Sequence, residues 1–111
     1  MIVLFTDFGL EGPYIGQVKA RILAEAPNAT IIDLFSDAPA HNPKACSYLL
    51  AAYVDAFPSG AIFLAVVDPG VGSNRAGVAV AAGGRWFVGP DNGLFEMAAR
   101  RADSAATWER K

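Results

Sequence analysis

The residues that most restrict the possible folds of this chain are 62–70. Residues 62–67 form a short apolar run typical of a buried strand, and the run ends in Asp68, Pro69 and Gly70. A residue before proline is driven out of the helical region, and Pro-Gly suits the centre of a type II turn. We therefore expect Asp68 to lie extended at the carboxyl end of the strand. In open α/β sheets, ligands bind at that end of the strands.

Strand-like and helix-like segments alternate along the rest of the chain. Short apolar runs predict further strands at residues 2–5, 30–34 and 106–109, and a hairpin made of residues 77–82 and 85–88 around Gly83-Gly84. Apolar residues at helical spacing predict helices at residues 13–26, 43–57 and 94–102. This alternation predicts a layered α/β/α domain with a largely parallel central sheet and a late β-hairpin.

Composition excludes several classes of partner. The chain has 111 residues, enough for one domain, and a formal net charge of -2, and its nine Lys and Arg residues are mostly scattered, so nucleic acid is not an expected ligand. No apolar run approaches the length of a membrane span, and no basic segment marks a signal peptide, so no membrane is expected. The single Cys46 lies in an apolar segment, which fits a small buried residue in a reducing cytoplasm.

Carboxylates that follow apolar runs are the main candidates for a site. The sequence has neither of the common glycine-rich nucleotide motifs and no HExxH or Cys/His cluster, and the lone His41 reads as a loop residue, so a metal site is not expected. Asp7, Asp68 and Asp91 each follow an apolar run. Any one of them could serve turn chemistry alone. Arg75 could fold back to pair with Asp68, or the two could form a solvated surface pair of little energetic worth.

Five blocks of sequence together resemble the S-adenosylmethionine hydroxide adenosyltransferases, a family related to enzymes that use chloride or fluoride on the same substrate. The blocks occur in the family's order and spacing, and they cover essentially the whole chain. They are Thr6-Asp7-Phe8-Gly9-Leu10, Tyr14-Ile15-Gly16-Gln17-Val18-Lys19, Phe57-Pro58-Ser59-Gly60, Val66 to Ser73 with Arg75, and Phe87-Val88-Gly89-Pro90-Asp91-Asn92-Gly93-Leu94.

The resemblance implies hydrolysis of S-adenosylmethionine to adenosine and methionine, by attack of water or hydroxide at the ribose C5′. Asp68 and Arg75 match two members of an Asp-Arg-His set that handles the water, and their presence favours water over halide. Asp7 matches the carboxylate that holds the ribose hydroxyls. The other expected substrate-binding residues are Phe8, His41, Asp91 and Asn92. No metal or redox cofactor is implied.

The resemblance also implies that residues 1–111 are part of an N-terminal α/β domain. The family's C-terminal domain is absent from this sequence, and the histidine of the water-handling set would lie beyond Lys111. The complete protein is expected to be a homotrimer, and this chain alone is expected to be inactive. Two alternatives stay open: a halide-using relative, and a non-catalytic domain that binds an adenosyl ligand or serves as an assembly surface.

Overall fold

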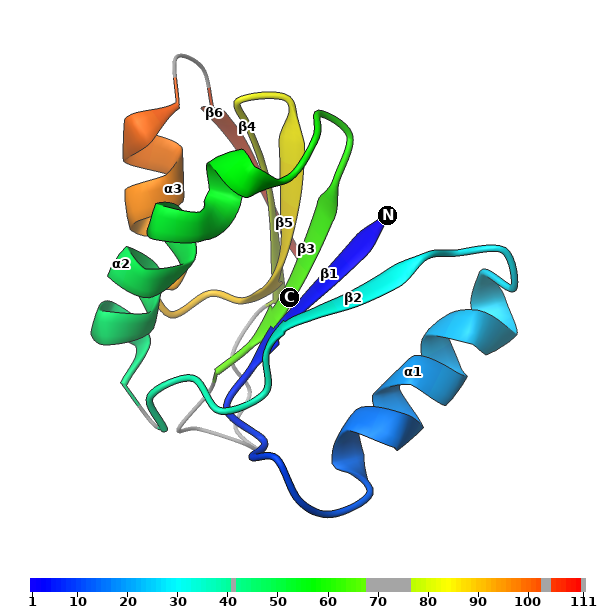
Figure 1. Ribbon diagram of the computed structural model, residues 1–111. Helices are drawn as coiled ribbons and strands as arrows, with labels where there is room; N and C mark the ends of the chain where they lie inside the picture. The colour runs from blue at the N-terminus through cyan, green and yellow to red at the C-terminus, as the bar shows by residue number, and fades with distance from the viewer. Residues whose placement is uncertain (41, 68–76, 103–104, 111) are drawn as a thin grey trace.

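The computed structural model describes residues 1–40, 42–67, 77–102 and 105–110, and it has the expected α/β architecture (Figure 1). The elements, in chain order, are β1 (Ile2–Thr6), α1 (Tyr14–Glu25), β2 (Ile31–Phe35), α2 (Pro43–Tyr53), a short 3-10 helix η1 (Val54–Ala56), β3 (Ile62–Val66), β4 (Gly77–Ala82), β5 (Arg85–Pro90), α3 (Glu96–Arg101) and β6 (Ala105–Arg110). Every strand and helix expected from the sequence is present. None of the described helices is both long enough and apolar enough to cross a membrane.

One six-stranded mixed sheet forms the centre of the fold, with the strand order β2-β1-β3-β5-β4-β6. The first four strands in this order run parallel, whereas β4 runs antiparallel to both of its neighbours, β5 and β6. The predicted hairpin is therefore confirmed. Its two-residue loop is Gly83-Gly84, and both residues have positive φ values, +59° and +80°. A two-residue hairpin loop of the common type needs this conformation, which only glycine adopts easily.

The order of the strands decides where the helices lie. The chain passes from β1 through α1 to β2 on one side of β1, and then from β2 through α2 to β3 on the other side. Because both crossovers are expected to be right-handed, the two helices must cover opposite faces of the sheet. Figure 1 shows this arrangement, with α2 and α3 together on one face and α1 on the other. The expected α/β/α layering is present.

The main core lies between the sheet and the pair α2 and α3. Alternate strand residues point into this layer, and the aromatic ones pack closely. The rings of Phe63 and Phe87 are nearly parallel, and their centroids are 4.9 Å apart. From the helical side, Cys46 and Leu50 are completely buried. Burial of this apolar surface is the principal force that holds α2 against the sheet.

The helix α1 buries much less of its surface against the sheet than α2 does. None of the residues of α1 is buried. Of the four apolar residues whose spacing predicts this helix, Ile15, Val18 and Ile22 are half-buried, whereas Leu23 is exposed. A salt bridge of 2.7 Å from Lys19 to Asp33 joins α1 to β2. On the same face of the sheet, beyond the reach of α1, the side chains of Ile62, Trp86 and Val88 are 37%, 41% and 37% exposed.

Two helices differ at their ends from the sequence-based expectation. The helix predicted to run to residue 57 ends at Tyr53 and continues only as η1. The helix predicted from residue 94 begins at Glu96. The two residues before it, Leu94 and Phe95, lie in a turn and pack into the core, with 1% and 4% of their surfaces exposed. The spacing of apolar residues does not distinguish the predicted helix ends from the observed ones.

Replacement of Gly89 tests the close packing of β5 against β3 and Phe95. A Cβ atom on Gly89 would lie 2.2 Å from the Ala65 carbonyl oxygen and 3.0 Å from the Phe95 ring. We expect Gly89→Ala to lower the free energy of unfolding by about 3 kcal/mol, since neither β3 nor the buried ring can move away freely. Urea unfolding measures this loss.

The matched control is Gly16→Ala, on the exposed surface of α1, where a Cβ would meet no atom within 4 Å. This variant should gain about 0.5–1 kcal/mol from the higher helix propensity of alanine. A Gly89→Ala protein as stable as the unchanged chain would contradict the packing described for β3 and β5.

Candidate functional site

The carboxyl ends of β1 and β3 lie side by side, and the chain leaves them in opposite directions. Register places Thr6 opposite Val66, and the Asp7 amide donates to the Val66 carbonyl at 3.4 Å. The chain after β1 goes to β2, on one side, and the chain after β3 goes to β4, on the other. Crevices at such reversals are the usual ligand sites of open α/β sheets. This edge is therefore the candidate functional site.

Main-chain hydrogen bonds hold the segment that carries Asp7 and Phe8. The Ala38 amide donates to the Thr6 carbonyl at 3.0 Å, and the Gly9 amide donates to the Ser36 carbonyl at 2.6 Å. The loops after β1 and β2 are thus joined on both sides of Asp7. Both predicted side chains, Asp7 and Phe8, are half-buried, so a ligand could reach them. A carboxylate there can accept hydrogen bonds from hydroxyl groups or attract a cation.

Cys46 of α2 lies beneath this segment. It is completely buried, as predicted, and its thiol donates to the Pro39 carbonyl at 3.3 Å. Burial, which is the larger cause, and the negative charge of Asp7 together raise the pKa of Cys46 from its ordinary value of 9.0 to about 11. Cys46 is therefore a neutral thiol at physiological pH and not a nucleophile. Because the charge of Asp7 contributes to this shift, the pKa of Cys46 is sensitive to the distance between the thiol and the Asp7 carboxylate.

The Thr6 side chain is a feature of this edge that the sequence analysis missed. It is completely buried, and its hydroxyl oxygen makes no hydrogen bond in the described part of the chain. A buried polar group without a partner is unfavourable, and such groups are uncommon in native proteins. The one signal in the sequence is that Thr6 directly precedes Asp7 in the first block that resembles the family.

The loop after β5 brings two more predicted residues to the same edge. Asp91 is exposed, whereas Asn92 is half-buried. The Asn92 side-chain Nδ2 donates to the Val67 carbonyl at 2.6 Å, and its Oδ1 accepts from the Leu94 amide at 3.2 Å. The structure therefore brings together the ends of β1, β3 and β5. Whether Asp91 and Asn92 also contact a ligand stays a prediction.

Three predicted site residues, His41, Asp68 and Arg75, lie outside the described residues. Their roles, and the pairing of Asp68 with Arg75, stay predictions. Within the described ranges, no group of three His, Cys, Asp or Glu side chains is placed to hold a metal ion.

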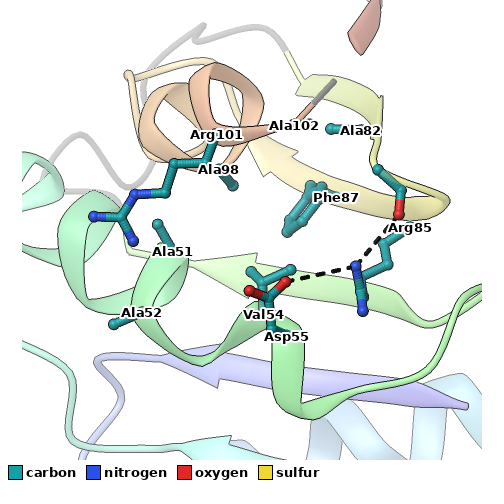
Figure 2. A pocket seen from close by; sticks show the side chains of 11 residues that line it. Ala51, Ala52, Val54, Asp55, Ala82, Arg85, Phe87, Ala98, Arg101 and Ala102 are labelled. Atoms are coloured by element: carbon teal, nitrogen blue, oxygen red, sulfur yellow. Dashed lines mark hydrogen bonds and ion pairs between the residues drawn. The ribbon is translucent and has the colours of Figure 1, made fainter. Parts of the chain in front are cut away.

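A hollow of about 270 Å³ lies at the opposite edge of the sheet, where the parallel strands begin (Figure 2). On one side of it, the Arg85 side chain donates from Nε and Nη2 to the Phe57 carbonyl at 2.9 and 2.6 Å, and Nη1 lies 3.9 Å from Asp55. Arg85 thus closes the turn before β3. The hollow shares no residue with the carboxyl edge and contains none of the predicted site residues, so it is not the candidate site.

Comparison with known proteins gives a consistent result. Residues 2–111 match the family model described as the SAM hydroxide adenosyltransferase N-terminal domain. Two similar curated proteins are (R)-S-adenosyl-L-methionine hydrolases: that of Thermus thermophilus is 47% identical over 87% of this chain and 38% of its own, and that of Methanocaldococcus jannaschii is 37% identical over 91% and 40%. The chain thus spans about 40% of the length of these relatives.

Solved structures agree with this match. A crystal structure of an uncharacterized conserved protein from Thermotoga maritima superposes with a TM-score of 0.90 at 36% identity, over 100% of this chain and 43% of that one. A conserved hypothetical protein from Thermus thermophilus gives a TM-score of 0.81 at 41% identity, over 98% and 46%.

Thr6→Val tests whether the buried hydroxyl has a partner. Valine has nearly the same shape and lacks the hydroxyl, so removal of an unpaired buried polar group should leave stability unchanged or raise it by about 1 kcal/mol. Thermal unfolding measures the difference, and Thr30→Val, at an exposed threonine, is the control. A loss of stability greater than about 1 kcal/mol would mean that the hydroxyl is hydrogen-bonded in solution.

The pKa of Cys46 provides a test of the proximity of Asp7. Because the folded-state pKa lies above that of the unfolded chain, the stabilisation is present below pH 9 and is lost as the pH rises to about 11. Unfolding followed from pH 8 to 11 should show a loss about 2–3 kcal/mol larger in the unchanged chain than in Cys46→Ala. Asp7→Asn should lower the pKa of the thiol. An unaltered thiol titration in Asp7→Asn would contradict the proximity of the two groups.

Proposed function

Because this chain belongs to the SAM hydroxide adenosyltransferase family, we propose that it is part of an enzyme that hydrolyses S-adenosyl-L-methionine to adenosine and L-methionine. The observation that carries the proposal is the convergence of Asp7 and the end of β3 at the reversal of the sheet, in a chain 47% identical to a named (R)-S-adenosyl-L-methionine hydrolase. From the names of the relatives we take the (R) form of the substrate as the preferred one.

The proposed reaction is a displacement at the ribose C5′. A water oxygen forms a bond to C5′ as the bond from C5′ to sulfur breaks, and the electron pair of that bond stays on sulfur in methionine. The positive charge of the sulfonium disappears in this step, so a pocket that contains little water assists it. Water at neutral pH is a poor nucleophile, and the protein must therefore supply help to it.

We assign that help to Asp68 and Arg75. The Arg75 guanidinium would stabilise hydroxide character on the attacking water, while the Asp68 carboxylate would orient the water or accept its proton. The Asp7 carboxylate would accept hydrogen bonds from the two ribose hydroxyls and attract the sulfonium, with Phe8, His41 and Asp91 nearby. No step in this scheme needs a metal or a redox cofactor. This chain covers about 40% of the length of its relatives, so the proposed reaction is that of a longer protein. We also propose that this longer protein is a homotrimer and acts in the cytoplasm.

The test uses a full-length protein in which this chain is followed by the remaining part of the Thermus thermophilus relative. Purified protein is given each sulfonium epimer separately, with and without chloride, and the products are separated by chromatography. We expect adenosine and methionine in equal amounts, and faster turnover of the (R) epimer. A chlorinated adenosine as the main product would show a halide-using enzyme. Binding of adenosine without turnover would show a non-catalytic domain.

Variants of the same protein test the assigned roles. Asp68→Asn and Arg75→Met should each lower kcat by at least about 100-fold, the usual scale for loss of acid-base or electrostatic catalysis. Asp7→Asn should act mainly on KM. The control is Asp33→Asn, which removes the same charge from β2, where Asp33 is paired with Lys19. Turnover that survives loss of Asp68 or Arg75 within a factor of a few would refute the assignment.

A further inference from the structure

The hydrogen-bond ladder between β3 and β5 is interrupted before it reaches the end of β3. Within the ladder, donors on β5 and acceptors on β3 are 25 residues apart, and the first such bond runs from the Trp86 amide to the Ala61 carbonyl at 3.0 Å. Parallel strands form these bonds at every second residue. The same spacing would pair residue 90 with Ala65, and residue 92 with Val67.

Neither of these two main-chain bonds can form. Residue 90 is a proline and has no N–H group to donate. The main-chain N–H of Asn92 is used elsewhere, since it donates to the Pro90 carbonyl at 3.1 Å. The carbonyl of Val67, which is completely buried, would thus lack a main-chain donor of the kind that Trp86 supplies to the Ala61 carbonyl.

The side chain of Asn92 replaces the missing donor. Its Nδ2 donates to the Val67 carbonyl at 2.6 Å, at the same separation of 25 residues that the ladder uses. The amide group is itself held, because its Oδ1 accepts from the Leu94 main chain at 3.2 Å, and Leu94 is buried in the core. Both polar atoms of this side chain therefore have main-chain partners that fix its orientation.

The bond determines the position from which the chain leaves β3. The Val67 carbonyl carbon is bonded directly to the nitrogen of residue 68, and the peptide group between them is planar. The hydrogen bond from Asn92 therefore fixes the orientation of the Val67 carbonyl group, the group that directly precedes residue 68 in the chain. We infer that Asn92 is a positioning residue for the reaction proposed above: its amide replaces a main-chain donor and holds the peptide group that precedes Asp68. This inference depends on the proposed function.

Two substitutions separate this role from general support of the fold. Asn92→Asp keeps an acceptor for the Leu94 amide and loses the donor to Val67, whereas Asn92→Ala loses both. The control is Ser47→Ala, because the Ser47 hydroxyl oxygen is a buried acceptor for the Met97 amide, at 3.2 Å, and lies outside the proposed machinery. This variant also removes one hydrogen bond between a side chain and the main chain, although in this bond the side chain accepts.

The kinetic experiment measures kcat and KM of the full-length protein. Both Asn92 variants should lower kcat by 10-fold to 100-fold and change KM by less than about threefold, since placement of the nucleophile-activating groups affects the reacting state more than substrate binding. Ser47→Ala should keep kcat within twofold. Equal losses of kcat in Ser47→Ala and Asn92→Asp would overturn the inference, and so would an Asn92→Asp protein with unchanged kcat.

A second measurement does not depend on activity. In the 111-residue chain, NMR detects the coupling across the hydrogen bond between Asn92 Nδ2 and the Val67 carbonyl carbon, and the shift of that carbon. We expect the coupling in the unchanged chain and in Ser47→Ala, and its loss with a shift of the Val67 carbon in Asn92→Asp. Its absence in the unchanged chain would overturn the inference. A full-length protein with the coupling but without hydrolysis would instead refute the proposed function.

Discussion

The parallel pairing of β1 with β3 is the constraint on which the rest of the structure depends. Thr6 lies opposite Val66, so the chain segments that follow these two strands start at the same height on the sheet. From there they turn away from one another, toward β2 and β4. Right-handed crossovers then place α1 and α2 on different faces. The position of Asp7 beside the end of β3 is a consequence of this main-chain pairing. It does not depend on a side-chain contact between Asp7 and β3.

Local sequence patterns were sufficient to predict the elements of this fold. Apolar runs end where carboxylates and turn residues begin, so the strand ends were predicted within one or two residues at β1, β2 and β3. Periodicity could not predict how deeply a helix is buried. The residues of α1 have the spacing of a packed helix, yet none of them is buried, because burial depends on a second surface that the spacing does not describe.

The site was predictable only where it depends on the nature of a residue and not on the register of two strands. The sequence identifies Asp7 as a carboxylate at the end of a strand, and topology confirms its position at the carboxyl edge. By contrast, the bond from Asn92 to Val67 depends on which residues of β3 and β5 face each other and on the presence of Pro90. The pairing of Asp68 with Arg75 lies outside the described residues and stays a prediction.

The polar groups at the two edges of the sheet differ in their hydrogen bonding. At the amino edge, Arg85 donates twice to the Phe57 carbonyl, and a tight glycine loop closes the hairpin. At the carboxyl edge, the buried Thr6 hydroxyl has no hydrogen-bond partner among the residues that the structure describes, and the ladder of β3 and β5 is broken at Pro90. Departures from optimal local structure are expected where a protein carries out its function.

The hydrogen bond from Asn92 to Val67 also has an evolutionary consequence. Every amino acid except proline carries a main-chain N–H, so few mutations can remove a bond between two backbones, whereas one codon decides whether a side-chain amide exists. At this single position, selection can vary how firmly the end of β3 is held while the six strands keep their pairing. The domain can thus explore small changes of geometry beside the candidate site in single mutational steps, without loss of the folded sheet.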